Sequence, residues 1–250
     1  MTELGITYYN DFVDINSVAN PVTDKAPQMQ FSGFLEKDWM ASGIDFDKFG
    51  YGLKKTVNNQ GAIFCKDASM LFSDGVGYVQ MILSLPSSIV NGVYTPLKND
   101  NKELNEYILC GINIGQIENA QPGIYAALTP RGIEFTIWTS GSKFVIRDTV
   151  TNVSSNTDFI IEFVWDKDKL PESSATTGIR VDGDYTALGN APIYQDSIDG
   201  FNFYVLNTPF LYSGLECTIR KLITYNEVPD FLHEEVMSST SSSSSSSSSS

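Results

Sequence analysis

The sequence has few cysteines, a single histidine and no long apolar run, and each shortage argues against a class of protein. Its three cysteines are Cys65, Cys110 and Cys217. An odd and widely spaced set predicts neither a disulfide framework nor a zinc site, so we interpret them as small buried hydrophobic residues of a protein assembled under reducing conditions. The only histidine, His233, excludes a histidine-rich metal site, and a Ser–His–Asp arrangement would have to use this one residue.

Basic residues are also scarce, because 16 Lys and Arg stand against 30 Asp and Glu and give a net charge of −14. An acidic surface repels phosphate backbones, so nucleic acid is not expected as a partner. No stretch approaches the roughly 18 apolar residues of a membrane span, so no membrane insertion is expected. The N-terminus lacks the basic and apolar regions of a secretory signal, which predicts synthesis in the cytoplasm.

Short runs of β-branched and aromatic residues dominate what is present. A chain of 250 residues suits one large β domain, and Val, Ile, Thr, Phe and Tyr are the residues that strands favour. Turn signals separate these runs, including Asp182-Gly183, which predicts a tight hairpin. We expect strands at residues 78–85, 107–114, 123–128, 132–138, 144–150, 158–165, 178–181, 185–188, 201–206 and 215–225.

Strict alternation in residues 132–138 predicts two distinct faces on that strand. Ile133, Phe135 and Ile137 share the apolar face, whereas Glu134, Thr136 and Trp138 share the other. In the last long run, Arg220 and Lys221 interrupt the apolar phase. This break fits either a β-bulge or an edge strand with basic residues that prevent aggregation.

Three groups of residues carry a resemblance to a known family. Residues 201–237 contain two apolar runs around Gly214, then Tyr225-Asn226 and an acidic Glu234-Glu235 pair. Earlier, residues 163–166 end in Trp-Asp and residues 179–183 end in Val-Asp-Gly. In this order, over residues 62–237, the chain resembles laminin-G-like and concanavalin A-like domains. The resemblance implies an all-β, two-sheet antiparallel jelly-roll sandwich with one short C-terminal helix.

The chain divides into three parts on this basis. Residues 1–60 are either N-terminal strands that join the sandwich or an assembly arm, and residues 61–237 form the jelly roll. Residues 238–250 are almost entirely serine. Because polyserine has no apolar area to bury, we expect this tail to be a disordered spacer that tethers the folded unit.

Catalysis has little support in the sequence. Jelly-roll glucanases carry a Glu-x-Asp-x-x-Glu motif on one strand, and this motif is missing here. Glu162 and Asp166 lie four residues apart, on one face of an expected strand, but no third carboxylate completes the set. We therefore expect a protein that is not an enzyme. Turnover of a polysaccharide that disappears in a Glu162→Gln variant would revive the hydrolase interpretation.

Calcium is the cofactor that the resemblance suggests, since related lectin domains hold Ca²⁺ at one rim through loop aspartates. Calcium needs six to eight oxygen ligands, and ordinary turn aspartates are the alternative explanation. Glycan binding would use aromatic rings near loops or out of phase with the apolar face, and their alternative role is packing at the rim. The candidate metal ligands are Asp166, Asp168, Asp182 and Asp184, and the candidate ligand-binding aromatics are Trp138, Tyr94, Tyr194 and Tyr212.

The function that these features favour is recognition without catalysis. We expect an adhesion module, such as a phage fibre or decoration protein, that binds a surface glycan or protein after assembly in the cytoplasm. Its further partners would be other virion or surface-assembly subunits and copies of itself. The alternatives are a purely structural scaffold protein and, less favoured, a glycoside hydrolase. This functional interpretation rests on the fold.

Overall fold

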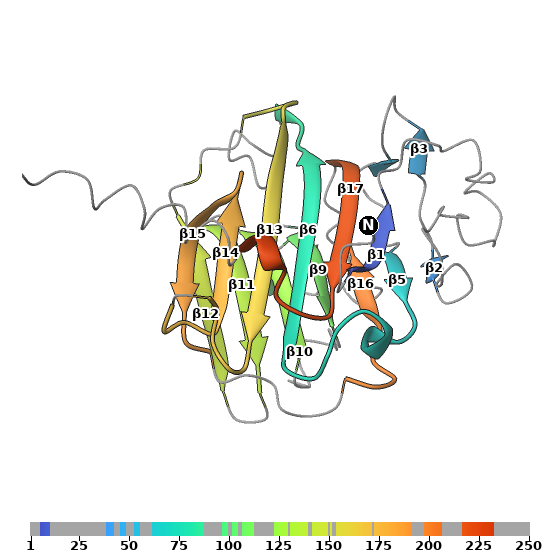
Figure 1. The fold of residues 1–250 in the computed structure, drawn as a ribbon. Coiled ribbons are helices and arrows are strands. Elements are labelled where there is room, and N and C mark those ends of the chain that lie inside the picture. Colours follow the sequence, from blue (N-terminus) through green and yellow to red (C-terminus); the bar gives the residue numbers. More distant parts are fainter. Residues whose placement is uncertain are drawn as a thin grey trace, which may run out of the picture.

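The computed structural model folds into two antiparallel β-sheets that pack face to face (Figure 1). No helix among the residues described is long and apolar enough to cross a membrane. The residues described are 6–10, 39–42, 46–48, 53–55, 62–87, 97–99, 102–104, 107–112, 123–129, 131–139, 142–149, 151, 154–171, 173–191, 198–206 and 217–232.

Sheet A contains eight strands within these ranges. Seven of them follow one another across the sheet, and β1 (Ile6–Asn10) pairs with β17 beside that row. The order is β15 (Asp184–Gly189), β14 (Thr177–Val181), β13 (Asp158–Asp166), β6 (Val76–Ser84), β17 (Cys217–Tyr225), β4 (Leu53–Lys55) and β3 (Phe46–Lys48).

Sheet B contains seven strands in the described part of the chain. Outside both sheets, a small hairpin of β7 (Leu97–Asn99) and β8 (Lys102–Leu104) lies between the strands expected at residues 78–85 and 107–114. The order in sheet B is β12 (Lys143–Asp148), β11 (Gly132–Trp138), β10 (Gly123–Thr129), β9 (Tyr107–Ile112), β16 (Phe203–Val205), β5 (Ala62–Cys65) and β2 (Trp39–Ser42).

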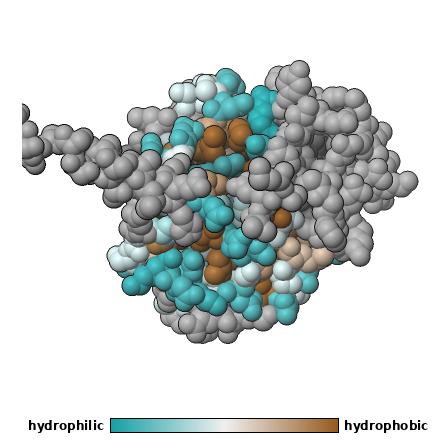
Figure 2. Space-filling model, viewed as in Figure 1, coloured by the Kyte–Doolittle hydropathy of each residue, from teal (hydrophilic) through white to brown (hydrophobic). Residues whose placement is uncertain are grey.

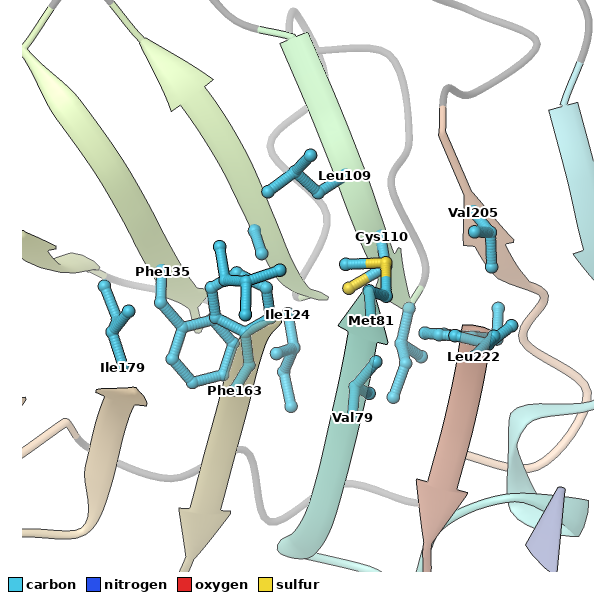
Figure 3. Packing of buried hydrophobic residues seen from close by; sticks show 14 of the residues in the cluster. Val79, Met81, Leu109, Cys110, Ile124, Phe135, Phe163, Ile179, Val205 and Leu222 are labelled. Atoms are coloured by element: carbon cyan, nitrogen blue, oxygen red, sulfur yellow. The ribbon is translucent and has the colours of Figure 1, made fainter. Parts of the chain in front are cut away.

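The core lies between the sheets and is built around aromatic rings. The Phe135 ring of sheet B lies 5.5 Å from Phe163 and 5.9 Å from Trp165 of sheet A, measured between centroids. The Phe72 ring lies 5.1 Å from both Trp165 and Phe203. Figure 3 shows Phe135 and Phe163 meeting among aliphatic side chains from both sheets. The predicted two-sheet sandwich is therefore confirmed.

The hairpin predicted at Asp182-Gly183 is confirmed, and the strands expected at residues 123–128 and 132–138 form a second hairpin. Strands β10 and β11 pair from Thr129↔Gly132 outwards, and β14 and β15 pair across Asp182-Gly183. The interrupted phase of the last strand is a bulge, because the pairing of β17 with β6 shifts between Ile219 and Lys221. The edge-strand alternative was wrong, since β17 lies between β6 on one side and β4 and β1 on the other.

Strands from the first 60 residues pair with both sheets. Strand β1 pairs with β17, β3 pairs with β4 and β4 with β17, and β2 pairs with β5. The other residues of 1–60 lie outside the described ranges. The same holds for the polyserine tail at residues 238–250 and for the Glu234-Glu235 pair.

The outer face of sheet A carries a second apolar cluster beneath the C-terminal end of the described chain. The Tyr78 ring lies 5.3 Å from Tyr225 and 5.9 Å from Phe231, both in edge-on contact. Phe231 belongs to a single helical turn at residues 230–232, which corresponds to the predicted short helix. A short 3₁₀ helix, η3 (Ala68–Met70), is capped at its start by Asp67, whose side chain accepts a hydrogen bond from the Ser69 amide.

The three cysteines are buried and not bonded to one another. Cys65, Cys110 and Cys217 all belong to the main core, as their apolar sequence context predicted. Burial raises the pKa of the Cys110 thiol, so the reactive thiolate is disfavoured there. They act as small packing residues.

Gly132 offers a direct test of the hairpin that joins β10 and β11. Its φ is +125°, and a Cβ added there would lie 1.9 Å from the Asp148 carbonyl oxygen. Gly183 also has a positive φ, +96°, but nothing lies within 4 Å of its added Cβ. Gly183→Ala should therefore lower the free energy of unfolding by about 1–2 kcal/mol, which is the cost of a left-handed backbone conformation for alanine. Gly132→Ala should cost about 1–3 kcal/mol more, because the Asp148 backbone has to move.

Urea unfolding of the two variants measures this difference. Equal losses of unfolding free energy in Gly132→Ala and Gly183→Ala would contradict the close approach of β12 to this turn.

Candidate functional site

The outer face of sheet A carries a buried polar network centred on Glu162. This residue is 3% exposed and lies between Gln80 of β6 and Arg180 of β14 in the strand register. The Tyr78 hydroxyl and Gln80 Nε2 (2.8 Å) both donate to Glu162 Oε1. Arg180 Nη1 lies 3.2 Å from Oε2. The carboxylate thus accepts hydrogen bonds on Oε1 and forms an ion pair through Oε2.

The surroundings of this network indicate a structural role. Arg180 is fully buried, its Nη2 donates to the Gly183 carbonyl, and its guanidinium lies 5.2 Å from the Tyr185 ring centroid. Burial, together with the Glu162 carboxylate, raises the pKa of the Tyr78 hydroxyl far above its usual range. Because Glu162 is enclosed by its partners, it is poorly placed to reach a substrate. Figure 2 views the molecule from this side, where described hydrophilic and hydrophobic residues are interspersed.

The outer face of sheet B carries the side chains of β11 that alternate with its apolar, core-facing side chains. Strands β11 and β12 pair in regular register, so their outward side chains form three adjacent pairs. We call this set the outer ladder. Its pairs are Trp138↔Lys143, Thr136↔Val145 and Glu134↔Arg147.

One end of the outer ladder is aromatic. Lys143 Nζ lies 5.5 Å from the Trp138 ring centroid and 5.7 Å from that of Tyr125 on β10. Trp138 is half-buried and pairs on its other side with Gly123, which has no side chain. Two partly buried rings beside an ammonium group suit stacking against the apolar face of a sugar, with hydrogen bonds at its edge.

The other end of the outer ladder is charged. Glu134 is buried, and its Oε1 is approached by Arg147 Nε at 2.6 Å and by Arg131 Nε at 3.8 Å. The Thr129 hydroxyl donates to the same oxygen at 3.1 Å. Glu134 thus orients two guanidinium groups that remain accessible, since the Arg147 side chain is 32% exposed and that of Arg131 is 72% exposed.

Thr136 occupies the middle of the outer ladder and is completely buried. Its hydroxyl has no hydrogen-bond partner among the residues described. The only other buried side-chain atoms described of which this is true are Glu162 Oε2 and Arg180 Nε. An unsatisfied buried hydroxyl is costly, so its retention calls for a reason.

The four candidate metal ligands fall into two separate places. Asp166, the last residue of β13, accepts a hydrogen bond from the Asp168 amide at 2.8 Å. Asp182 accepts from the Ile160 amide at 2.9 Å, near the start of β13, and Asp184 begins β15. Ile160 and Asp166 are six residues apart on one strand, or about 20 Å, so one ion does not reach both pairs.

Within the described residues, no group of three or more His, Cys, Asp or Glu side chains converges on a metal-sized site. Hydrogen bonds to neighbouring amides are what ordinary turn aspartates make. Calcium binding remains a prediction, and a chelator tests it.

Of the four candidate aromatics, the structure describes Trp138, and Tyr94, Tyr194 and Tyr212 lie outside the described residues. Sequence reasoning missed Tyr125, Lys143, Arg131 and Arg147 as companions of Trp138. The alternation of residues 132–138 already separated Trp138, Thr136 and Glu134 from the core. The identity of their cross-strand neighbours required the register of three strands.

No protein family model matches this chain. No curated protein matches it either. Solved structures do match this chain, and the three described next share 13% identity or less with it. At this identity, the structural match shows a common fold.

Domain 4 of an extracellular arabinanase from Geobacillus stearothermophilus, solved with arabinotriose, matches with a TM-score of 0.54 and 13% identity over 93% of this chain and 98% of that domain. Trypanosoma rangeli sialidase, solved with sialic acid, matches with a TM-score of 0.56 and 10% identity over 95% of this chain and 33% of the sialidase. The receptor-binding domain of botulinum neurotoxin mosaic serotype C/D matches with a TM-score of 0.57 and 10% identity over 94% of this chain and 51% of that domain. The chain thus shares its two-sheet jelly-roll fold with these proteins.

The buried network on sheet A predicts a specific pattern of stability. Glu162→Gln and Arg180→Met should each lower the free energy of unfolding by about 3–5 kcal/mol, because each leaves a buried polar partner without compensation. The double variant Glu162→Gln/Arg180→Met should lose clearly less unfolding free energy than the sum of the two single losses. Urea unfolding of the four proteins measures the coupling. Additive losses would show that the two side chains do not stabilise each other.

Proposed function

We propose that this protein is a non-catalytic recognition module that binds a carbohydrate on the outer face of sheet B. The observation that carries the proposal is the outer ladder with Tyr125, which places two aromatic rings, an ammonium group and two guanidinium groups on one sheet face. Protein sites that bind sugars need this combination of flat apolar surface and hydrogen-bond donors.

The solved structures that share the fold support this choice. The arabinanase domain was solved with arabinotriose, and the toxin domain is a receptor-binding domain. On this basis we also infer a place in the laminin-G-like, non-catalytic branch of the fold. Support comes from the Trp165-Asp166 strand end and from the Val181-Asp182-Gly183 hairpin, in that order.

The absence of catalysis is part of the proposal. Glycosidases place two carboxyl groups about 5–10 Å apart on either side of the bond that they cleave. Among the described outward residues of β10, β11 and β12, Glu134 is the single carboxylate, and it is held by Arg147 and Thr129. Glu162, the carboxylate considered from sequence, is enclosed on the opposite sheet.

We further propose that the module acts on a virion surface, in a phage fibre or decoration protein. Buried cysteines that form no disulfide with one another suit assembly in a reducing compartment, and the polyserine run suits a flexible tether. Immunogold labelling of particles purified from the source organism tests this location. Label on cells and none on particles would contradict the virion proposal without touching the carbohydrate-binding one.

A glycan array with the full chain, read in calcium and again in chelator, tests the carbohydrate proposal. Saturable binding is expected, and Trp138→Ala should weaken it by about ten-fold, or ~1.5 kcal/mol, through loss of one stacking ring. Leu188→Ala is the matched control, because Leu188 is 48% exposed on β15 of the other sheet. Equal effects of Trp138→Ala and Leu188→Ala would contradict the assigned face.

The chelator arm decides the metal question separately. Loss of binding in chelator would direct attention to the loops of Asp166 and Asp182, whereas unchanged binding would leave the aromatic face as the sole site. Silence across the array would favour the scaffold function.

A further inference from the structure

The charge on the outer ladder differs in sign from that of the whole chain. The chain carries a net charge of −14. The described outward side chains of β10, β11 and β12, with the turn residue Arg131, include three cations and one carboxylate: Arg131, Lys143, Arg147 and Glu134. Asp148 does not offset them, because it lies in phase with the inner face, is buried and bonds to Thr151. Among these described residues, the single carboxylate of Glu134 is shared by two guanidinium groups, those of Arg131 and Arg147.

The terminal nitrogens of Arg147 make no hydrogen bond to Glu134. Its Nε donates to Glu134 Oε1, and its hydrogen bonds to described residues involve this nitrogen only. A guanidinium carries five N–H donors in a fixed fork, and its two terminal nitrogens match the two oxygens of a carboxylate or sulfate. Glu134 therefore acts as a positioning residue that fixes the plane of the fork.

The spacing of the two ends sets the size of the ligand. Lys143 and Arg147 lie four residues apart on an extended strand, or about 13 Å. Thr136, with its unpartnered hydroxyl, lies between them on the neighbouring strand. A single sugar ring is shorter than this track, so an oligosaccharide is needed to contact both ends.

We propose that this face binds an acidic oligosaccharide, with a sugar ring stacked on Trp138 and Tyr125 and a carboxylate or sulfate group held by Arg147 and Arg131. This inference rests on the proposed carbohydrate function and narrows it to a class of ligand. We infer an acidic group because Glu134 supplies one negative charge to two guanidinium groups, those of Arg131 and Arg147. An anionic group of the ligand would balance the second positive charge.

Matched acidic and neutral probes test the inference with the full chain. The pairs are oligogalacturonate with its methyl ester, chondroitin sulfate oligosaccharide with its desulfated form, and sialyllactose with lactose. At least one acidic member is expected to bind about ten-fold or more tightly than its neutral counterpart, as a charge-assisted bidentate contact provides. Equal affinities within every pair would overturn the acidic inference and leave the carbohydrate function intact. No binding to any probe would defeat both proposals.

Variants locate the preference on the molecule. Arg147→Gln should remove the preference for the acidic member of a pair and retain residual binding of the neutral member. Arg147→Lys keeps the charge but loses the forked guanidinium, so its preference should lie between those of the unmodified protein and Arg147→Gln. Arg131→Gln should weaken acidic binding about two- to ten-fold, and its 72% exposure makes it safe for folding. Arg220→Gln is the control, since Arg220 pairs with Asp158 on sheet A. A preference unchanged in both Arg147→Gln and Arg131→Gln would overturn the assignment.

Discussion

The contact of Phe135 with Phe163 and Trp165 between the two sheets is the constraint on which the rest of the molecule depends. Side chains of a strand alternate between its faces, so turning Phe135 into the core fixes the direction of every neighbour on β11. Glu134, Thr136 and Trp138 then face outward. A one-residue slip would exchange these two sets, and the core and the candidate site would both be lost. The packing of the core and the placement of the candidate site are thus two consequences of one register.

The two outer faces use polar residues in opposite ways. On sheet A, Glu162 and Arg180 are enclosed with Tyr78, and the charges satisfy each other. On sheet B, the buried Glu134 holds arginines whose guanidiniums still reach solvent. A closed ion pair contributes a fixed arrangement, whereas an ion pair with surplus donors is available to a ligand. This difference, rather than the presence of charge, distinguishes the candidate site from the structural network.

Much of the fold was predictable from local signals. Short stretches of sequence predicted the Asp182-Gly183 turn and the strand that begins at Gly132, and both are confirmed. The break in phase at Arg220 and Lys221 left a bulge and an edge strand as alternatives, and the register shift between Ile219 and Lys221 shows the bulge. The position of β17 inside sheet A was not predictable, because pairing with both β6 and β4 joins segments far apart in the chain. The candidate site shows the same division. Trp138 was identified from its phase, but its partners Lys143 and Tyr125 came from cross-strand register, which composition does not encode.

The central claim is that the outer face of sheet B is the binding surface. The most direct measurement is an NMR titration of the isotope-labelled protein with the oligosaccharide that it binds most tightly. The account predicts saturable shift changes in the amides of β10, β11 and β12, strongest around Trp138, Thr136 and Arg147, and no comparable changes around Glu162 on sheet A. Shift changes centred on sheet A or on the Asp166 and Asp182 loops, with β11 unaffected, would contradict it.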